Sequence, residues 1–168
     1  MKSQYINLNK LIICTIFSFS GLSCSADTIN GTVVSVTDGD TVTLLDELKV
    51  QHKIRLAGID APEKKQAFGM RSKDSLSDLV YKKQVIIETN KTDRYGREIG
   101  VIFVYGKDAN LEQVNRGFAW HYKAYQREQS ANDRRLYEYA EREARAVKKG
   151  LWIDANPTPP WEFRHVKK

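Results

Sequence analysis

Acidic residues gather in two short segments whose side chains are suited to binding a metal ion. The sequence reads DGD at 38–40, just before a stretch rich in Val and Thr, and DAPE at 60–63, just after an apolar stretch. Residues two apart in a strand face the same side, which would aim Asp38 and Asp40 in one direction. Carboxylates that converge need a cation, and oxygen donors joined by a backbone carbonyl favour Ca²⁺ or Mg²⁺. The two segments therefore predict a divalent-cation site if the fold brings them together.

Two arginines accompany the acids. Arg55 interrupts an otherwise apolar strand, and Arg97 ends the segment TDRYGR, which connects two later strands. Guanidinium groups beside a cation would bind an anion, because their paired N–H groups match the oxygens of a phosphate. Acids and arginines together predict a site for a phosphate ester.

Each of these segments also has a purely structural explanation. Asp-Gly at 38–39 is a strong hairpin-turn signal, and Asp60 with Glu63 has the spacing of a helix capping box. Arg55 at a sheet edge would pack the aliphatic part of its side chain on the sheet and leave its guanidinium group in water. The segment at 92–97 would serve as a hairpin loop with a glycine in the left-handed position.

The hydrophobic pattern predicts an α+β domain in which a small Greek-key β-barrel carries helices on one side, an architecture that commonly binds oligonucleotides. Three strand-like stretches come first, then a helix, two more strands and two further helices. Asn110 is expected to begin the second helix with Gln113 completing a capping box, and Ser130 with Asp133 to begin the last. The expected strands are 29–37, 40–45, 50–59, 84–89 and 97–105, and the first expected helix is 66–81.

The composition is that of a folded, basic protein of one domain. The 168 residues are 41% hydrophobic and 29% charged, which gives enough apolar material for one core. The formal charge of +6 favours acidic partners such as nucleic acid or anionic lipid. We expect a monomer without stable membrane association.

The first 26 residues have the layout of a signal peptide. Two lysines precede an apolar run at 11–22, and small residues lead up to Ala26. The run is shorter than the roughly 20 apolar residues of a membrane span, so we expect cleavage after Ala26 and export to the periplasm or the medium. Lipid attachment at Cys24 is the alternative. Because Cys14 and Cys24 both precede the cleavage point, disulfides and a cysteine nucleophile are excluded from the mature chain.

The end of the chain differs in composition from the domain that precedes it. Residues 27–153 form the predicted domain, and 154–168 contain three prolines at positions 157, 159 and 160. We expect this tail to run extended over the surface or to be mobile.

Four motifs in register resemble the staphylococcal nuclease family: DGDTV, RLAGIDAPE, TDRYGR and NLEQVNRGFAW. The resemblance runs from about Thr28 to Trp152. It implies a five-stranded OB-type Greek-key barrel with three helices, and a Ca²⁺-dependent phosphodiesterase and endonuclease acting on DNA and RNA, with Mg²⁺ as another possible metal.

The resemblance also implies a role for individual residues. It makes Asp40, Asp60 and the Ala61 carbonyl the metal ligands, with Asp38 in the outer shell. Glu63 would be the general base for the attacking water. By position, the phosphate ligands would be Arg55 and Arg97, and the nucleotide contacts would be Arg94, Tyr95 and Tyr125.

The sequence departs from the staphylococcal enzyme at three places. Ala61 stands where that enzyme has Thr, the segment 64–69 is shorter than its mobile loop, and Lys123 replaces a tyrosine that stacks on the base. The first change leaves the carbonyl available, whereas the other two bear on base preference.

Two other functions are compatible with parts of the sequence. A secreted OB-type protein that binds nucleic acid without cutting it would use the basic and aromatic residues, but it has no use for four acids facing a polyanion. A histidine-based nuclease is disfavoured, because His52, His121 and His165 are scattered without metal-ligand spacing.

Overall fold

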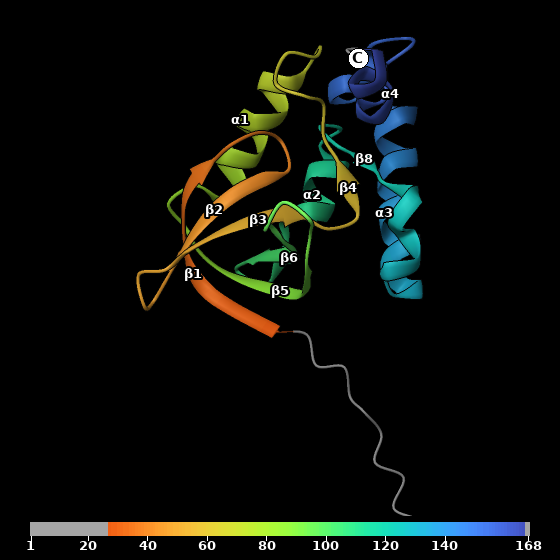
Figure 1. The fold of residues 1–168 in the computed structure, drawn as a ribbon. Helices are drawn as coiled ribbons and strands as arrows, with labels where there is room; N and C mark the ends of the chain where they lie inside the picture. The colour runs from red at the N-terminus through yellow and green to blue at the C-terminus, as the bar shows by residue number, and fades with distance from the viewer. Residues whose placement is uncertain (1–26, 167–168) are drawn as a thin grey trace, which may run out of the picture.

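The computed structural model describes residues 27–166, and its centre is a closed five-stranded barrel (Figure 1). Neighbouring strands follow the order β3-β2-β1-β5-β6, and β3 pairs with β6 in parallel to close the barrel. The OB-type barrel predicted from the sequence is confirmed. Its strands are β1 (Asp27–Val36), β2 (Thr41–Asp46), β3 (Gln51–Leu56), β5 (Gln84–Thr92) and β6 (Glu98–Val104).

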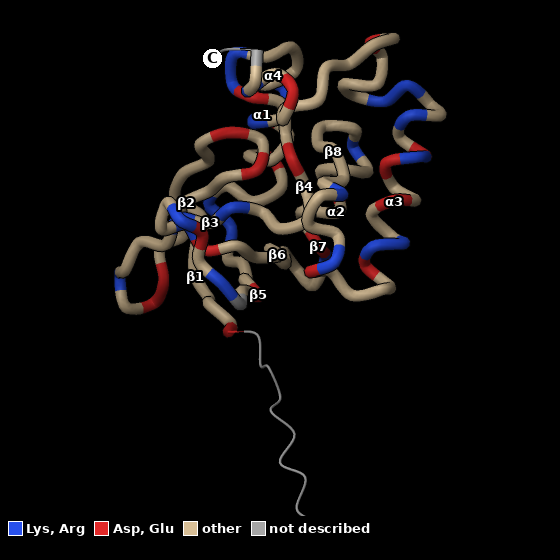
Figure 2. The backbone as a smooth tube through the Cα atoms, turned by 45° about the vertical axis from the view of Figure 1, so that its right-hand side comes forward, with Lys and Arg blue, Asp and Glu red and all other residues tan. Residues whose placement is uncertain are grey.

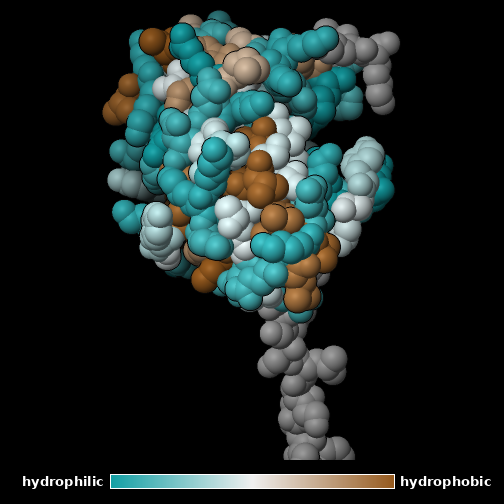
Figure 3. Space-filling view, turned by 90° about the vertical axis from the view of Figure 1, so that its left-hand side faces the viewer, coloured by the Kyte–Doolittle hydropathy of each residue, from teal (hydrophilic) through white to brown (hydrophobic). Residues whose placement is uncertain are grey.

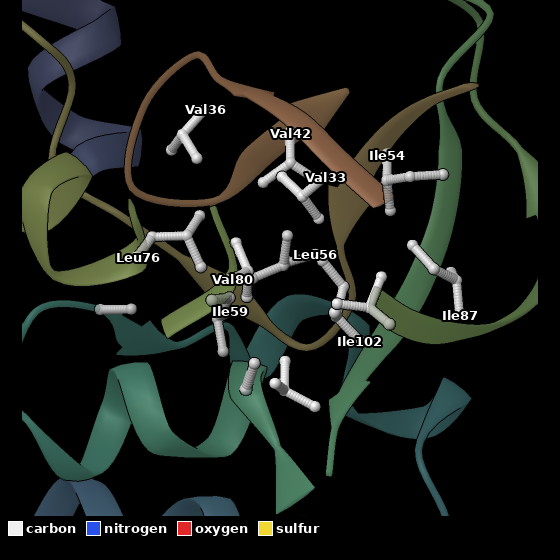
Figure 4. Close-up of a cluster of buried hydrophobic side chains, with 14 of the residues drawn as sticks. Val33, Val36, Val42, Ile54, Leu56, Ile59, Leu76, Val80, Ile87 and Ile102 are labelled. Atoms are coloured by element: carbon white, nitrogen blue, oxygen red, sulfur yellow. The ribbon is translucent and has the colours of Figure 1, made fainter. Parts of the chain in front are cut away.

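Alternation along the strands fills the barrel with branched aliphatic side chains. In β6, for example, every second residue from Gly100 to Val104 is buried, so one face of the strand lines the interior. Helix α1 adds Leu76 and Val80 to the same core. Figure 4 shows these side chains meeting inside the barrel: Val33, Val36, Val42, Ile54, Leu56, Ile59, Leu76, Val80, Ile87 and Ile102.

Short strands and helices complete the domain at one side of the barrel (Figure 1). Strand β4, only two residues long, pairs with β8, and β7 extends the sheet beyond β6. The bounds are β4 (Ile59–Asp60), β7 (Lys107–Asp108), β8 (Trp120–His121), α1 (Gly69–Val80), α2 (Ala109–Asn115), α3 (Ala131–Ala146) and α4 (Pro160–Val166), with 3-10 turns η1 (Lys123–Glu128) and η2 (Gly150–Ile153).

One predicted helix cap is confirmed and one is wrong. The Ser130 side chain accepts from Asp133 N at the start of α3, as expected. At α2 the cap is Asp108, which accepts from Leu111 N, and Asn110 is buried instead. The Asn110 amide donates to the carbonyl oxygens of Ala57 and Gly100, so it ties α2 to the closing strands of the barrel.

The proline-containing tail is not extended throughout, which corrects the sequence-based expectation. Residues Pro160–Val166 form a fourth helix, with proline at its first position, where the missing N–H costs nothing. Trp161 packs its ring 5.5 Å from that of Trp120 and 5.5 Å from that of Tyr122. This aromatic contact holds α4 on the domain. The signal peptide expected at 1–26 lies outside the described residues.

The surface has the character expected of a chain rich in Lys, Arg, Asp and Glu. Figure 3 shows hydrophilic side chains over most of one face, with a small hydrophobic area near its middle. Between residues 27 and 166, no helix has both the length and the apolar character needed to cross a membrane.

A half-buried polar bridge spans three strands of the barrel. His52 on β3 lies between Glu98 at the start of β6, 2.8 Å from Nδ1, and Asp46 at the end of β2, 3.0 Å from Nε2. Hydrogen bonds to Glu98 and then to Asp46 raise the pKa of His52 above its usual 6.5, outweighing the effect of burial. Protonated His52 therefore joins two carboxylates where the barrel closes.

This bridge makes part of the stability dependent on pH. The pKa of His52 is higher in the folded than in the unfolded state, so its contribution is fully present below about pH 6.5 and is lost as pH rises through the folded-state value. In urea unfolding, His52→Gln should lower the free energy of unfolding more at about pH 6 than at about pH 9. His165→Gln at the exposed end of α4 is the control, since it leaves the bridge intact. An equal loss for His52→Gln at both pH values would contradict this account.

Candidate active site

The DGD segment forms a tight turn between β1 and β2, and residues of helices α1 and α2 contact this turn. Asp40 N donates to Asp38 Oδ1 at 3.1 Å, so the turn is closed by its own side chain. The Gly39 carbonyl accepts from Gln113 Nε2 at 3.0 Å, and a Cβ at Gly39 would lie 1.8 Å from Ser72 Oγ. Only glycine fits this close approach. The hairpin-turn interpretation is therefore correct, and the turn also fixes the position of Asp40.

The second acidic segment reaches the same point in the fold. Pairing of Asp60 with Trp120 in β4 and β8 sets its direction, and Ala61 N donates to Asp40 Oδ2 at 2.6 Å. Asp40 and Asp60 are 6% and 1% exposed. The fold thus brings the two predicted metal-ligand carboxylates together, with the Ala61 backbone between them.

Arg55 lies between these two carboxylates. Its Nη2 is 2.9 Å from Asp60 Oδ1 and 3.2 Å from Asp40 Oδ2. Its Nη1 donates to the carbonyl oxygens of Leu56 and Ile59 at 2.9 and 3.0 Å. Arg55 therefore points inward to the acids, which excludes the alternative of a surface arginine with its head in water.

One guanidinium does not fully compensate the buried acids. Burial raises the pKa of Asp40 to about 7, even though Arg55 opposes the shift, and the charges of Asp38 and Asp60 raise it further. The site thus holds an excess of negative charge that another cation would relieve.

Glu63 lies in the loop after β4 and does not cap a helix. Helix α1 begins only at Gly69, so the capping-box interpretation of Asp60 and Glu63 is wrong. Gln66 shapes the loop instead: its Oε1 accepts from Glu63 N at 3.0 Å, and its N donates to Glu63 O at 2.7 Å. A Cβ on Gly69 would lie 2.0 Å from Glu63 O, so glycine is required for this compact loop.

An arginine that the sequence did not indicate joins Glu63 to Asp60. Arg164 on α4 places Nη2 2.7 Å from Asp60 Oδ2, and Nη1 3.2 Å from Asp60 Oδ1 and 2.8 Å from Glu63 Oε1. The acidic segment in and after β4 and helix α4, which carries the arginine, lie at the same end of the barrel (Figure 2).

Arg97 belongs to a loop that Asp93 organises. Asp93 Oδ1 accepts from the backbone N of Tyr95 and of Arg97, and its Oδ2 accepts from Arg97 Nε at 2.8 Å. Within residues 27–166 no hydrogen bond or ion pair joins Arg97 to Asp40 or Asp60. Because Glu98 pairs with Ile54, Arg97 nevertheless lies beside the strand that carries Arg55.

The expected nucleotide-contacting residues are exposed on two neighbouring loops. Tyr95 is 70% exposed, with the Arg94 and Arg97 guanidinium carbons 5.1 and 5.5 Å from its ring centre. Tyr125 in η1 is half exposed, with Lys91 Nζ 5.3 Å from its ring centre. These rings are accessible to a base but do not contact the acids in the described structure.

Comparison with known proteins identifies the family. The family model described as staphylococcal nuclease homologue matches residues 53–154. A Haemophilus influenzae protein named an uncharacterized endonuclease is 42% identical over 97% of this chain and 89% of its own length. An Escherichia coli O157:H7 protein of the same name is 42% identical over 95% of this chain and all of its own. A Shigella flexneri micrococcal nuclease is 39% identical over 82% of each chain.

The chain belongs to the staphylococcal nuclease family. Membership makes it a hydrolytic nuclease whose substrate is nucleic acid. The motif-based resemblance is thereby confirmed for the family and the fold.

The nuclease also has a cleft that lies apart from Asp40 and Asp60. It has a volume of about 330 Å³ between the barrel and α3, and Tyr125 and Lys91 form part of its lining. Four carboxylates line it as well: Glu88, Asp108, Glu128 and Asp133. These acids make the cleft a poor site for a polyanion, so the Asp40–Asp60 region remains the candidate active site.

The residues of the candidate site fit a hard divalent cation by their chemistry. Across residues 27–166, no three Asp, Glu, His or Cys side chains are arranged as a ready-made metal centre. Two buried carboxylates and a neighbouring backbone carbonyl are nevertheless all oxygen donors, which Ca²⁺ and Mg²⁺ prefer. Burial is the main cause of the raised pKa of Asp40, and a bound cation would favour the ionised form of this carboxylate.

Sequence reasoning missed three residues that hold the nuclease site. Gln113 and Gln66 fix the two acidic segments through backbone hydrogen bonds, and Arg164 contacts the acids directly. Glutamine gives no such signal in sequence. Arg164 had one: Pro160 at a first helical position and Glu162 in the first turn are typical of a helix start.

Replacement of Arg55 by lysine tests whether geometry, and not charge alone, matters at this position. An ammonium group cannot reach two carboxylates and two carbonyl oxygens at once, so buried acceptors would lose their donors. Arg55→Lys should lower kcat/KM by about 100-fold, because the acids shift. It should also lower the free energy of unfolding by about 1–3 kcal/mol.

The matched control is Arg142→Lys on the exposed face of α3, which should leave both quantities unchanged. Nuclease assays and urea unfolding of the two variants give the comparison. Wild-type turnover and stability in Arg55→Lys would mean that only the positive charge is needed.

Proposed function

We propose that the protein is a Ca²⁺-dependent endonuclease that hydrolyses phosphodiester bonds in both DNA and RNA. The observation that supports this proposal is the burial of Asp40 and Asp60 beside Arg55, with Ala61 N bonded to Asp40. Structural acids are seldom buried in pairs, because desolvation of each charge costs several kcal/mol. A pair that also faces the exposed Glu63 loop is suited to binding a cation and a phosphate.

In this proposal Asp40, Asp60 and the Ala61 carbonyl would hold the cation, with Asp38 outside them. The cation supplies charge stabilisation for the phosphate oxygens when it is bound. Arg55 keeps the two carboxylates in place, since its terminal nitrogens already face four acceptors. Arg97, in the loop just before β6, is the guanidinium that reaches a substrate phosphate once Asp93 releases it.

Glu63 is the group that handles the attacking water. Its side chain is 39% exposed and lies within reach of the same arginine as Asp60, so water and carboxylate meet beside the cation site. A carboxylate there orients the water and accepts its proton as the new P–O bond forms, while the bond from phosphorus to the leaving sugar oxygen breaks and that oxygen takes a proton from solvent water. Tyr95, Arg94 and Tyr125 would contact the nucleotide through their exposed faces.

The alternative of a binding protein that does not cut shares the basic surface but not the buried acids. The two functions separate in one assay: digestion of single-stranded DNA, double-stranded DNA and RNA with Ca²⁺, with Mg²⁺ and with a chelator. We expect cleavage with Ca²⁺ and its loss with chelator. Nucleic acid that is bound but is not cleaved with any metal would favour the binding protein.

Two substitutions assign the roles within the site. Glu63→Gln keeps the shape of the side chain but cannot take a proton, so kcat should fall by roughly 10²- to 10⁴-fold while Ca²⁺ affinity changes little. Asp40→Asn removes a charged ligand, so its Ca²⁺ affinity should fall. Nuclease kinetics and calorimetric Ca²⁺ titration of both variants provide the measurement. Full kcat in Glu63→Gln would refute the role of Glu63.

We also propose that the nuclease is exported with residues 1–26 removed. The layout of that segment supports export. Mass spectrometry of protein recovered from the periplasm or medium should give Asp27 as the first residue. A chain that starts at Met1, or one lipidated at Cys24, would contradict this.

A further inference from the structure

The last helix carries a guanidinium into the candidate active site. Arg164 makes three hydrogen bonds to Asp60 and Glu63, all between 2.7 and 3.2 Å, and its side chain is still 43% exposed. Arg55 Nη2 also contacts Asp60, at 2.9 Å from Oδ1. Two guanidinium groups thus share one buried carboxylate, and they differ in how accessible they are.

Helix α4 is built into the domain, so this contact is not that of a loose tail. Trp161 packs on Trp120, which belongs to a buried cluster with Trp152 and Leu151. Gln66, the residue that shapes the Glu63 loop, donates to Thr158 O at 2.5 Å just before the helix. The same side chain therefore fixes both Glu63 and the segment that carries Arg164.

The surroundings of Arg164 are basic on their open side. Glu63, Lys64, Lys65, Phe163 and Arg164 line a depression of about 290 Å³. Three cations and one carboxylate around an open depression favour an anion there. The depression lies directly beside the side chain that we assign to the attacking water.

We propose that Arg164, with Lys64 and Lys65, forms a binding subsite for a backbone phosphate of the nucleic-acid substrate. This inference rests on the proposed function of the same site. A cation bound at Asp60 would weaken the attraction between Asp60 and Arg164, so that only Glu63 still holds the guanidinium and Arg164 can contact a substrate phosphate. The Arg164 side chain is 43% exposed and its planar fork suits this contact, whereas that of Arg55 is only 15% exposed and also donates to two backbone carbonyls.

An arginine that merely blocks the site would have to leave before substrate enters. The packing of Trp161 and the bond from Gln66 to Thr158 keep α4 beside the loop, so Arg164 stays within reach of whatever binds there. Because Arg164 stays beside the bound substrate, a substrate-binding role is favoured over that of an arginine that only blocks the site.

The experiment compares Arg164→Ala and Arg164→Lys with Arg142→Ala, which removes the same charge from an exposed site on α3. Three quantities are measured: KM and kcat on a single-stranded DNA oligonucleotide, oligonucleotide affinity by fluorescence anisotropy in a Glu63→Gln background, and Ca²⁺ affinity by calorimetry without DNA. Circular dichroism and thermal unfolding check that each variant is folded.

Loss of the guanidinium should raise KM and weaken oligonucleotide binding by about 10- to 100-fold, with partial recovery in Arg164→Lys. Ca²⁺ affinity should stay the same or rise, since a competing cation leaves Asp60. The Arg142→Ala variant should match wild type. The double substitution of Lys64 and Lys65 by Ala should weaken binding in the same direction.

Two results would overturn the inference. Higher activity of Arg164→Ala at limiting Ca²⁺, with unchanged KM, would identify an arginine that only blocks the site. Unchanged KM and oligonucleotide affinity in a folded Arg164→Ala variant would leave only a structural contact. Both results differ from failure of the proposed function, in which the wild-type protein would not cleave nucleic acid with any metal. In that case the anisotropy assay would still measure the contribution of Arg164 to oligonucleotide binding.

Discussion

Two buried carboxylates that share one guanidinium are the constraint on which the rest of this structure depends. Asp40 and Asp60 come from different segments, and desolvation makes each of them costly unless Arg55 lies between them. Arg55 in turn binds two backbone carbonyls at the end of β3 and in β4. The ends of three strands are therefore held in register by one side chain, and the DGD turn and the loop carrying Glu63 are fixed relative to each other.

The protein also positions these acids through the side-chain amides of two glutamines. Gln113 is fully buried and donates to Gly39 O and to Ser72 O, which couples the first acidic segment to helices α1 and α2. Gln66 does the same for the second segment through Glu63. Amides satisfy buried backbone groups without adding charge to a site that already has an excess of it, so the carboxylates keep their affinity for an external cation.

The barrel could be predicted from the sequence because alternation of apolar residues is a local property, and all five strands were confirmed within a few residues. The acids could be placed because their motifs lie at strand ends. Prediction was wrong for 160–166, where the prolines at 157 and 159 favour extended backbone, whereas contacts with distant residues, such as the packing of Trp161 on Trp120, stabilise a helix. The role of Gln66 depends on partners that no local pattern encodes.

The distance along the chain between the partners at this site has a consequence for when the enzyme becomes active. Ala61 and Asp40 are 21 residues apart, and Arg164 and Asp60 are 104 apart. Closure of the barrel also pairs Ile54 with Glu98. Contacts between residues this far apart form late in folding, because closing a long loop costs chain entropy and proteins with many non-local contacts fold slowly. A partly folded chain therefore carries every acid and arginine of the site without the arrangement that would cut nucleic acid. The chain is inactive until folding is complete, and no separate inhibitor is needed to keep it so.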